Sequence, residues 1–146
     1  SFDSCADKVV YTGPIDEFFN YEHGRLEYRS LKFENRILNT QNHQGVAVKN
    51  FCDSEYPYTR IIEHKHFEKT QSEKTVITME YPQEYAEGLI PYYPINNDKN
   101  QRIYDEYKFA SKSLTKFIFG GRLSEYKYMD MHVVIESAMN KFRSNS

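Results

Sequence analysis

The 146-residue chain has no tryptophan, only two cysteines and no excess of basic residues. Its 19 Lys+Arg nearly balance 21 Asp+Glu, whereas nucleic-acid binding usually requires a basic face. No apolar run approaches the roughly 20 residues that span a bilayer. The first residues have neither a basic region nor an apolar signal core. We therefore expect a soluble, cytoplasmic protein that binds neither nucleic acid nor membrane.

Several motifs of catalysis and metal binding are also missing. Cys5 and Cys52 form no C-x-x-C pair, which predicts two buried or half-buried thiols in a reducing compartment. His64 and His66 have i, i+2 spacing on a predicted strand face, but no third ligand has suitable spacing, so no metal site is expected. Neither a GxGxxG segment, a Gly-x-Ser-x-Gly segment nor a Cys–His arrangement occurs. No side-chain nucleophile is therefore predicted.

Aromatic residues are abundant, with 13 Tyr and 10 Phe. Tyrosines place neutral hydrogen-bond donors on apolar surfaces, which suits ligand binding. Half-exposed strands also favour tyrosine, so composition alone leaves both interpretations open.

Short apolar or alternating runs predict many strands. Residues 9–11 form an apolar strand closed by a turn, and 15–19 form one helical turn whose acidic residues, Asp16 and Glu17, are expected to be solvated. Four further strands are predicted at 26–34, 46–51, 58–67 and 75–81, the last ended by Pro82. Their short polar linkers predict an antiparallel meander.

Two arginines lie in the middle of these predicted strands. Alternation places Arg29 on the same face as Leu31, and Arg60 lies on the apolar face of the third strand. A guanidinium on a core-directed face must be paired or point into a pocket. The two could converge on a phosphate, or each could bind a local carboxylate such as Glu27 or Glu63. Both interpretations stay open.

The last third of the chain has a different pattern. Asn97 and Asp98 can cap a helix over 99–111, residues 117–119 form a brief apolar strand stopped by a Gly-Gly turn, and a helix begins near Asp130. The strands 9–11 and 117–119 look like buried strands of an α/β sheet whose partners are absent. Such a pattern is typical of a piece of a larger protein.

Two constellations in this part could contact a ligand. Tyr93 lies in a stiff Pro-Tyr-Tyr-Pro segment and Tyr128 just before the last helix, whose first N–H groups can bind an anion or a carbonyl oxygen. The alternatives are ordinary aromatic packing and a plain glycine turn.

Six segments together resemble UDP-galactopyranose mutase. They occur in the family's order and at close to its spacing, and cover the chain from residue 9 to about 139: VYTGPID (10–16), LEYRSL (26–31), PYTRIIEHKHF (57–67), PYYPIN (91–96), FGGRL (119–123) and YKYMDMH (126–132). The resemblance implies a flavoprotein isomerase, an intramolecular transferase that interconverts UDP-galactopyranose and UDP-galactofuranose for cell-wall or lipopolysaccharide biosynthesis. It implies that reduced FAD acts through a flavin N5–galactose adduct, with no catalytic side chain.

The resemblance also assigns roles to individual residues. The implied substrate-binding residues are Arg29, Arg60, Tyr93, Tyr128 and Asp130, with UDP-galactose as substrate. The implied FAD contacts are Arg122 and the helix start, namely Met131, His132, Val133 and Val134.

Members of the family are far longer than this chain and begin with a Rossmann-type segment that binds FAD. We therefore expect the C-terminal portion: an α+β fold with a substrate-side antiparallel sheet over 21–90, flanked by parts of an incomplete FAD-binding α/β domain over 1–20 and 91–146. Alone, it is expected neither to retain FAD firmly nor to catalyse, and its uncovered surfaces would favour a homodimer. The alternative is a non-catalytic nucleotide-sugar or glycan-binding module.

Overall fold

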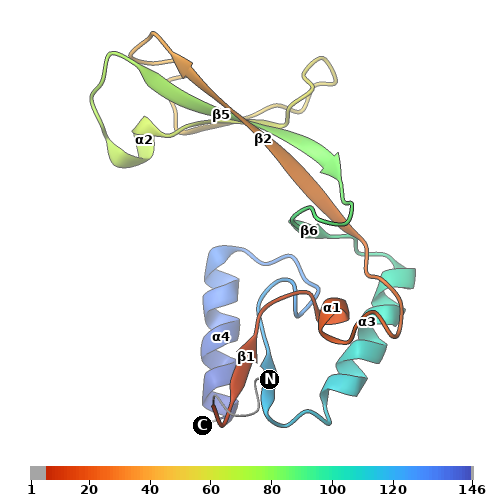
Figure 1. Cartoon of the computed structure of the whole chain (residues 1–146). Coiled ribbons are helices and arrows are strands. Elements are labelled where there is room, and N and C mark those ends of the chain that lie inside the picture. The colour runs from red at the N-terminus through yellow and green to blue at the C-terminus, as the bar shows by residue number, and fades with distance from the viewer. Residues whose placement is uncertain (1–5, 146) are drawn as a thin grey trace. The chain divides into compact units, whose positions relative to one another are not determined.

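The computed structural model describes residues 6–145 and has an α+β fold (Figure 1). The chain forms two compact units. Unit 1 joins Ser1–Tyr28 to Pro91–Ser146, and unit 2 consists of Arg29–Ile90. Within residues 6–145, no helix is both long and apolar enough to cross a membrane.

Unit 1 contains a parallel strand pair and three α-helices. Its elements are β1 (Val9–Tyr11), α1 (Ile15–Phe18), β6 (Tyr93–Pro94), α3 (Asp98–Ser111), β7 (Phe117–Phe119) and α4 (Met131–Asn145). β1 pairs with β7, and Val9 lies opposite Phe117. The predicted cap of α3 is confirmed, because Asn97 Oδ1 accepts a hydrogen bond from Asn100 N at 2.8 Å.

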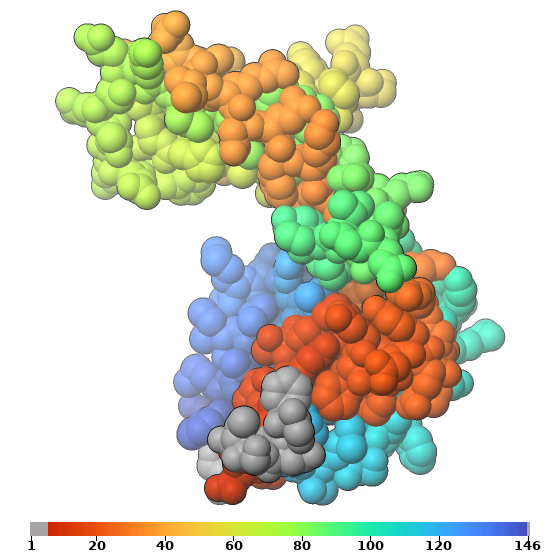
Figure 2. Space-filling view, viewed as in Figure 1, coloured from red at the N-terminus to blue at the C-terminus, as the bar shows by residue number. Residues whose placement is uncertain are grey.

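Aromatic rings fill the space between β1, α1, β7 and α3. The Phe18 ring centroid lies 4.9 Å from those of Tyr11 and Phe119. Tyr107 is fully buried, and its hydroxyl donates to Gly24 O at 2.7 Å and accepts from His23 N at 3.1 Å. Many aromatic residues thus serve packing in unit 1. Figure 2 shows the N-terminal segment of this unit, in red and orange, at its surface.

Asp16 corrects one expectation, because its carboxyl is buried rather than solvated. Asp16 Oδ2 accepts a hydrogen bond from Leu26 N at 3.0 Å, which ties α1 to a segment ten residues further along. Burial raises the pKa of this carboxyl. The sequence shows only an acidic residue in a first helical turn, so this long-range bond could not be read from local spacing.

Unit 2 is built on four antiparallel strands. They are β2 (Tyr28–Leu38), β3 (Val48–Asn50), β4 (Arg60–Glu63) and β5 (Thr75–Glu84), in the order β3-β4-β5-β2. The predicted meander is therefore wrong at β2, which pairs with β5 instead of its sequence neighbour β3. β2 and β5 match over ten residue pairs, whereas β3 has three residues.

The predicted ends of two strands in unit 2 also differ. β5 continues through Pro82 to Glu84. β4 begins at Arg60, opposite Glu80, so Pro82 lies beyond this neighbour and its missing N–H removes no bond to β4. The strand predicted to continue to residue 67 ends at Glu63, and α2 (Lys65–Glu68) follows. His66 therefore lies on a helix rather than on a strand face.

The core of unit 2 lies on one face of its sheet. Ile61, Ile77 and Met79 are buried there and pack with partly buried neighbours. On β2 the buried residues are Tyr28 and Ser30, which point to the opposite face from Arg29. The prediction that Arg29 lies on a core-directed face is therefore wrong. A period of two identifies two faces but not which of them is covered.

The cysteine prediction is also wrong for the thiol that the structure describes. Cys52 is free and exposed, in the loop between β3 and β4. Cys5 lies outside the described residues.

Candidate functional site

The two predicted substrate arginines of unit 2 lie on the same face of the sheet. Arg60 is directly opposite Glu80 and Arg29 directly opposite Glu84, both on β5, and opposed residues share a face. These two β5 positions are four residues apart, or about 14 Å along a strand. The structure thus places both guanidinium groups on one face without bringing them to a single point.

Arg60 has partners on its own face of the sheet. Its Nε donates to Asn50 Oδ1 at 3.0 Å, and its Nη1 lies 3.6 Å from Glu80 Oε2. The Arg60 side chain is 39% exposed and that of Glu80 only 9%. Asn50 and the buried Glu80 carboxylate therefore hold one edge of the guanidinium, while part of the group remains open to solvent.

The local carboxylates considered from the sequence do not pair with these arginines. Glu27 Oε1 accepts from Lys99 Nζ at 2.6 Å, and Glu63 binds other groups. Arg29 is exposed and makes no side-chain hydrogen bond or ion pair within residues 6–145. A solvated, unpaired guanidinium is free to bind an anion.

The arginine-bearing face is the more open face of unit 2, although Thr78 and Glu80, which lie on it, are buried. Cross-strand register places exposed apolar side chains on it, including Phe33, Ile37 and Val76, which are 41%, 73% and 41% exposed. The core lies on the opposite face. This face therefore combines cationic groups with exposed apolar surface, and exposed apolar patches often mark interaction sites.

Unit 1 brings together a second set of predicted residues. The rings of Tyr93 and Tyr128 lie 5.9 Å apart, and Tyr128 Oη donates to Asp130 Oδ1 at 3.1 Å. This bond and the Asp130 charge raise the pKa of the Tyr128 phenol. The positive charge of Arg122 lowers the same pKa, but by less. Tyr128 is 53% exposed. The phenol is thus a neutral, accessible donor with one hydrogen, now given to Asp130.

The Gly-Gly turn before Arg122 is fastened to α4. Gly121 has φ +86°, a conformation that favours glycine. Its N–H donates to Glu125 Oε1 at 3.2 Å, and Ser137 Oγ donates to the same oxygen at 2.9 Å. Lys141 Nζ lies 3.5 Å from it. Glu125 therefore connects the turn that carries Arg122 to two positions on the last helix.

The start of α4 offers backbone donors at an exposed site. Val134 N donates to Asp130 O at 3.0 Å, the first bond of the helical ladder. The N–H groups of Met131, His132 and Val133 consequently have no carbonyl partner within the helix. Met131 is 85% exposed and His132 is also exposed. Three N–H groups at a helix N-terminus can bind an anion or a carbonyl oxygen.

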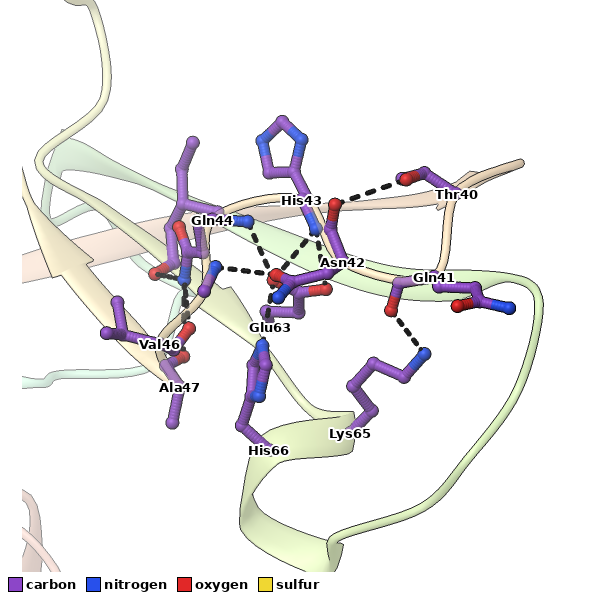
Figure 3. Close-up of polar contacts among 12 residues, drawn as sticks. Thr40, Gln41, Asn42, His43, Gln44, Val46, Ala47, Glu63, Lys65 and His66 are labelled. Carbon is purple, nitrogen blue, oxygen red and sulfur yellow. Dashed lines mark hydrogen bonds and ion pairs between the residues drawn. The ribbon is translucent and has the colours of Figure 1, made fainter.

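Unit 2 contains a buried carboxylate, Glu63, whose role in holding a loop the sequence did not reveal. Glu63 is fully buried, and its carboxylate accepts from His43 N at 3.0 Å and from Gln44 N at 3.0 Å (Figure 3). His66 Nε2 lies 3.1 Å from Glu63 Oε2. Burial raises the pKa of Glu63, but these contacts outweigh burial and lower it to about 2. Glu63 thus holds the loop after β2 against β4.

His64 has a different environment from His66. Its Nε2 lies 2.6 Å from Thr78 Oγ1, which donates to Asn35 Oδ1 at 2.7 Å. Each histidine therefore contacts its own polar partner, and no group of three potential metal ligands occurs in the part of the chain that the structure describes.

Comparison with known proteins gives consistent matches. A family model described as UDP-galactopyranose mutase matches residues 2–128. The chain is 42% identical over 132 residues to a probable UDP-galactopyranose mutase of Klebsiella pneumoniae, covering 90% of this chain and 34% of that protein. It is 38% identical over 132 residues to dTDP-fucopyranose mutase of Escherichia coli, covering 90% and 35%.

A third relative is the UDP-galactopyranose mutase of Mycoplasma pneumoniae, 34% identical over 139 residues, with 91% of this chain and 35% of that protein covered. The chain therefore spans about a third of the length of the curated relatives it matches.

Proposed function

Because this chain belongs to the UDP-galactopyranose mutase family, we propose that the longer protein containing it interconverts UDP-galactopyranose and UDP-galactofuranose. In this proposal unit 2 supplies the substrate-side sheet, and unit 1 supplies part of an FAD-binding domain. The observation that carries the proposal is the placement of Arg29 and Arg60 on one open face of the sheet.

Arg60 and Arg29 would bind the pyrophosphate of the sugar nucleotide. A guanidinium offers a planar set of donors that matches phosphate oxygens, and it stays charged at every physiological pH. Glu80 and Asn50 orient Arg60 before the ligand arrives. Arg29, which has no partner of its own within residues 6–145, can reorient toward the ligand.

Within unit 1, Tyr93 and Tyr128 would offer neutral donors to a phosphate oxygen of the nucleotide. The Tyr128 phenol has a single hydrogen, so a bond to a phosphate oxygen would replace its bond to Asp130. Asp130 would then carry an unpaired charge beside the ligand, and Arg122 is the nearby cation that offsets it. Proton transfer is not required of these residues, which orient the ligand and its leaving group.

The start of α4 would contact one part of a flavin. The three N–H groups at its exposed start and Arg122 would hold FAD, which when bound and reduced supplies the nucleophile for the sugar. This chain has no GxGxxG segment to bind the pyrophosphate of FAD. We therefore propose that the chain alone neither retains FAD firmly nor turns over.

The decisive experiment compares the full-length protein with this chain. We expect the full-length protein, supplied with reduced FAD, to convert UDP-galactofuranose to UDP-galactopyranose. The chain alone should be colourless after FAD addition and gel filtration. A full-length protein without turnover would refute the catalytic proposal. Micromolar or tighter UDP binding by the inactive chain alone would instead favour a nucleotide-sugar-binding module.

The nucleotide requires its own comparison. The E. coli relative is named for a dTDP-sugar, and it is nearly as similar to this chain as the K. pneumoniae relative. Titration of the full-length protein with UDP and with dTDP separates the two candidates. The proposed function requires tighter binding of UDP.

Replacing Tyr128 by phenylalanine in the full-length protein should have a moderate effect. The variant loses one neutral donor and keeps the ring that contacts Tyr93. We expect UDP affinity to fall about two- to tenfold, as expected for one neutral hydrogen bond. Isothermal titration measures this change, and unchanged affinity would remove Tyr128 from the binding site.

A further inference from the structure

One buried phenol connects three segments of unit 1. Tyr126 is 4% exposed. Its Oη donates to Glu27 O at 2.5 Å, accepts from Ile95 N at 3.2 Å, and lies 3.0 Å from Ile95 O. Because a phenol has a single hydrogen, the shorter contact with Glu27 O takes the donated bond. Ile95 N also donates directly to Glu27 O at 3.0 Å, so the hydroxyl ties the segment around residue 126 to this pair of strand ends.

The backbone at Tyr126 is held in an uncommon conformation. Its φ is +44°, in the left-handed region that residues other than glycine rarely adopt. Neighbouring bonds support this turn, since Lys127 N donates to Arg122 O at 3.0 Å. A residue other than glycine keeps such a conformation only where the surroundings impose it. Here the phenol and the turn impose it together.

The connected segments carry the predicted phenol donors. Tyr93 lies two residues before Ile95, and Tyr128 lies two residues after Tyr126. The 5.9 Å spacing of the Tyr93 and Tyr128 rings therefore depends on how closely segment 93–95 is held to segment 126–128. The two rings contact each other, but the Tyr128 hydroxyl bonds Asp130 and so does not tie the two segments together.

We propose that Tyr126 is a positioning residue that sets the spacing of Tyr93 and Tyr128 for nucleotide binding. This inference rests on the proposed function, since it requires that the two phenols contact the ligand. Tyr126 itself is buried and does not reach the ligand. Burial raises its pKa to about 12, further above neutral pH than the ordinary value of a tyrosine.

Tyr107 offers a matched control. It is a buried tyrosine of the same unit, and its hydroxyl also donates to one carbonyl and accepts from one backbone N–H. The residues it joins, His23 and Gly24, carry no predicted ligand contact. Changing either tyrosine to phenylalanine removes one bond donated to a carbonyl and one accepted from a backbone N–H. Both variants should therefore lose similar thermal stability.

The test measures UDP affinity, KM and kcat in the full-length protein, at a temperature where all variants remain folded. We expect Tyr126→Phe to weaken UDP binding and raise KM about three- to tenfold, with kcat changed less. Tyr107→Phe should bind UDP like the wild type. Equal affinities for Tyr126→Phe and the wild type, or equal losses in both variants, would overturn the inference.

A double variant tests the route of action. If Tyr126 acts through Tyr128, adding Tyr126→Phe to Tyr128→Phe should weaken binding less than Tyr126→Phe does alone. Fully additive losses would contradict positioning of Tyr128. A wild-type protein that binds no UDP would refute the proposed function itself, an outcome distinct from a wild type that binds while Tyr126→Phe is unaffected.

Discussion

Replacing Arg60 by alanine in the full-length protein is expected to weaken UDP binding by about 10- to 150-fold. The estimate is the roughly 1.5–3 kcal/mol of a hydrogen bond to a charged group, converted at 1.4 kcal/mol per tenfold. Arg60 is the arginine whose guanidinium is already oriented, by Asn50 and Glu80, on the open face of unit 2. Isothermal titration with UDP measures the loss.

Arg36 is the matched control for this variant. It lies on β2 opposite Ile77, on the core-bearing face, and its Nη2 lies 3.4 Å from Glu34 Oε2. Arg36→Ala also removes an exposed, paired guanidinium, but should leave UDP affinity within about twofold, as surface ion pairs contribute little. Thermal unfolding of both variants checks that the loss of the Glu80 partner has not unfolded unit 2. Equal UDP affinities in the two variants would exclude Arg60 from the site.

Replacing Glu63 by glutamine should give the largest loss of stability among single conservative changes in unit 2. The amide can accept with one oxygen only, and its NH₂ group would meet a backbone N–H that the carboxylate now binds. We expect a loss of roughly 1.5–3 kcal/mol in the free energy of unfolding. Faster amide hydrogen exchange over residues 41–47 should accompany it.

The control is Glu68→Gln, an exposed carboxylate on α2, which should stay within about 0.5 kcal/mol of the wild type. The pH dependence gives a second measurement. The pKa of Glu63 falls from 4.5 to about 2 on folding, so its stabilisation is complete above pH 4.5 and is lost as the pH falls toward 2. Glu63→Gln should flatten the stability curve in this window, and an unchanged curve would contradict the assignment.

Local sequence signals were sufficient for much of unit 1. The Asn97 cap, the apolar run of β7 and the start of α4 all follow from short-range chemistry, namely a side-chain acceptor for an end N–H, a run of β-formers before glycine, and helical periodicity. Asp16 escaped the same reasoning because its partner, Leu26 N, lies outside any local window.

Unit 2 shows where periodicity becomes ambiguous. Alternation from residue 58 to 67 predicted one strand, but the chain turns into α2, where Lys65 Nζ donates to Gln41 O at 2.6 Å and Ser72 O at 2.8 Å. These partners come from two loops, one of them more than twenty residues earlier in the chain. Likewise, alternation grouped Arg29 with Leu31 correctly, but only the fold shows which face is covered.

The site residues also divide into those that the sequence identified and those that only the fold reveals. The resemblance selected Tyr93, Tyr128 and Asp130, which the structure places together, whereas their roles remain predictions. It did not select Tyr126 or Glu63, although both lie within its matching segments. A positive φ and a fully buried carboxylate leave no pattern in a single sequence, because each depends on partners that the fold supplies.

The parallel pairing of β1 with β7 also bears on the order in which the molecule forms. Val9 pairs with Phe117, more than a hundred residues later in the chain, whereas every strand pair within unit 2 closes over a shorter stretch. Long-range closure carries the larger entropic cost and is the slower step. During synthesis the sheet of unit 2 can therefore assemble before β1 pairs with β7.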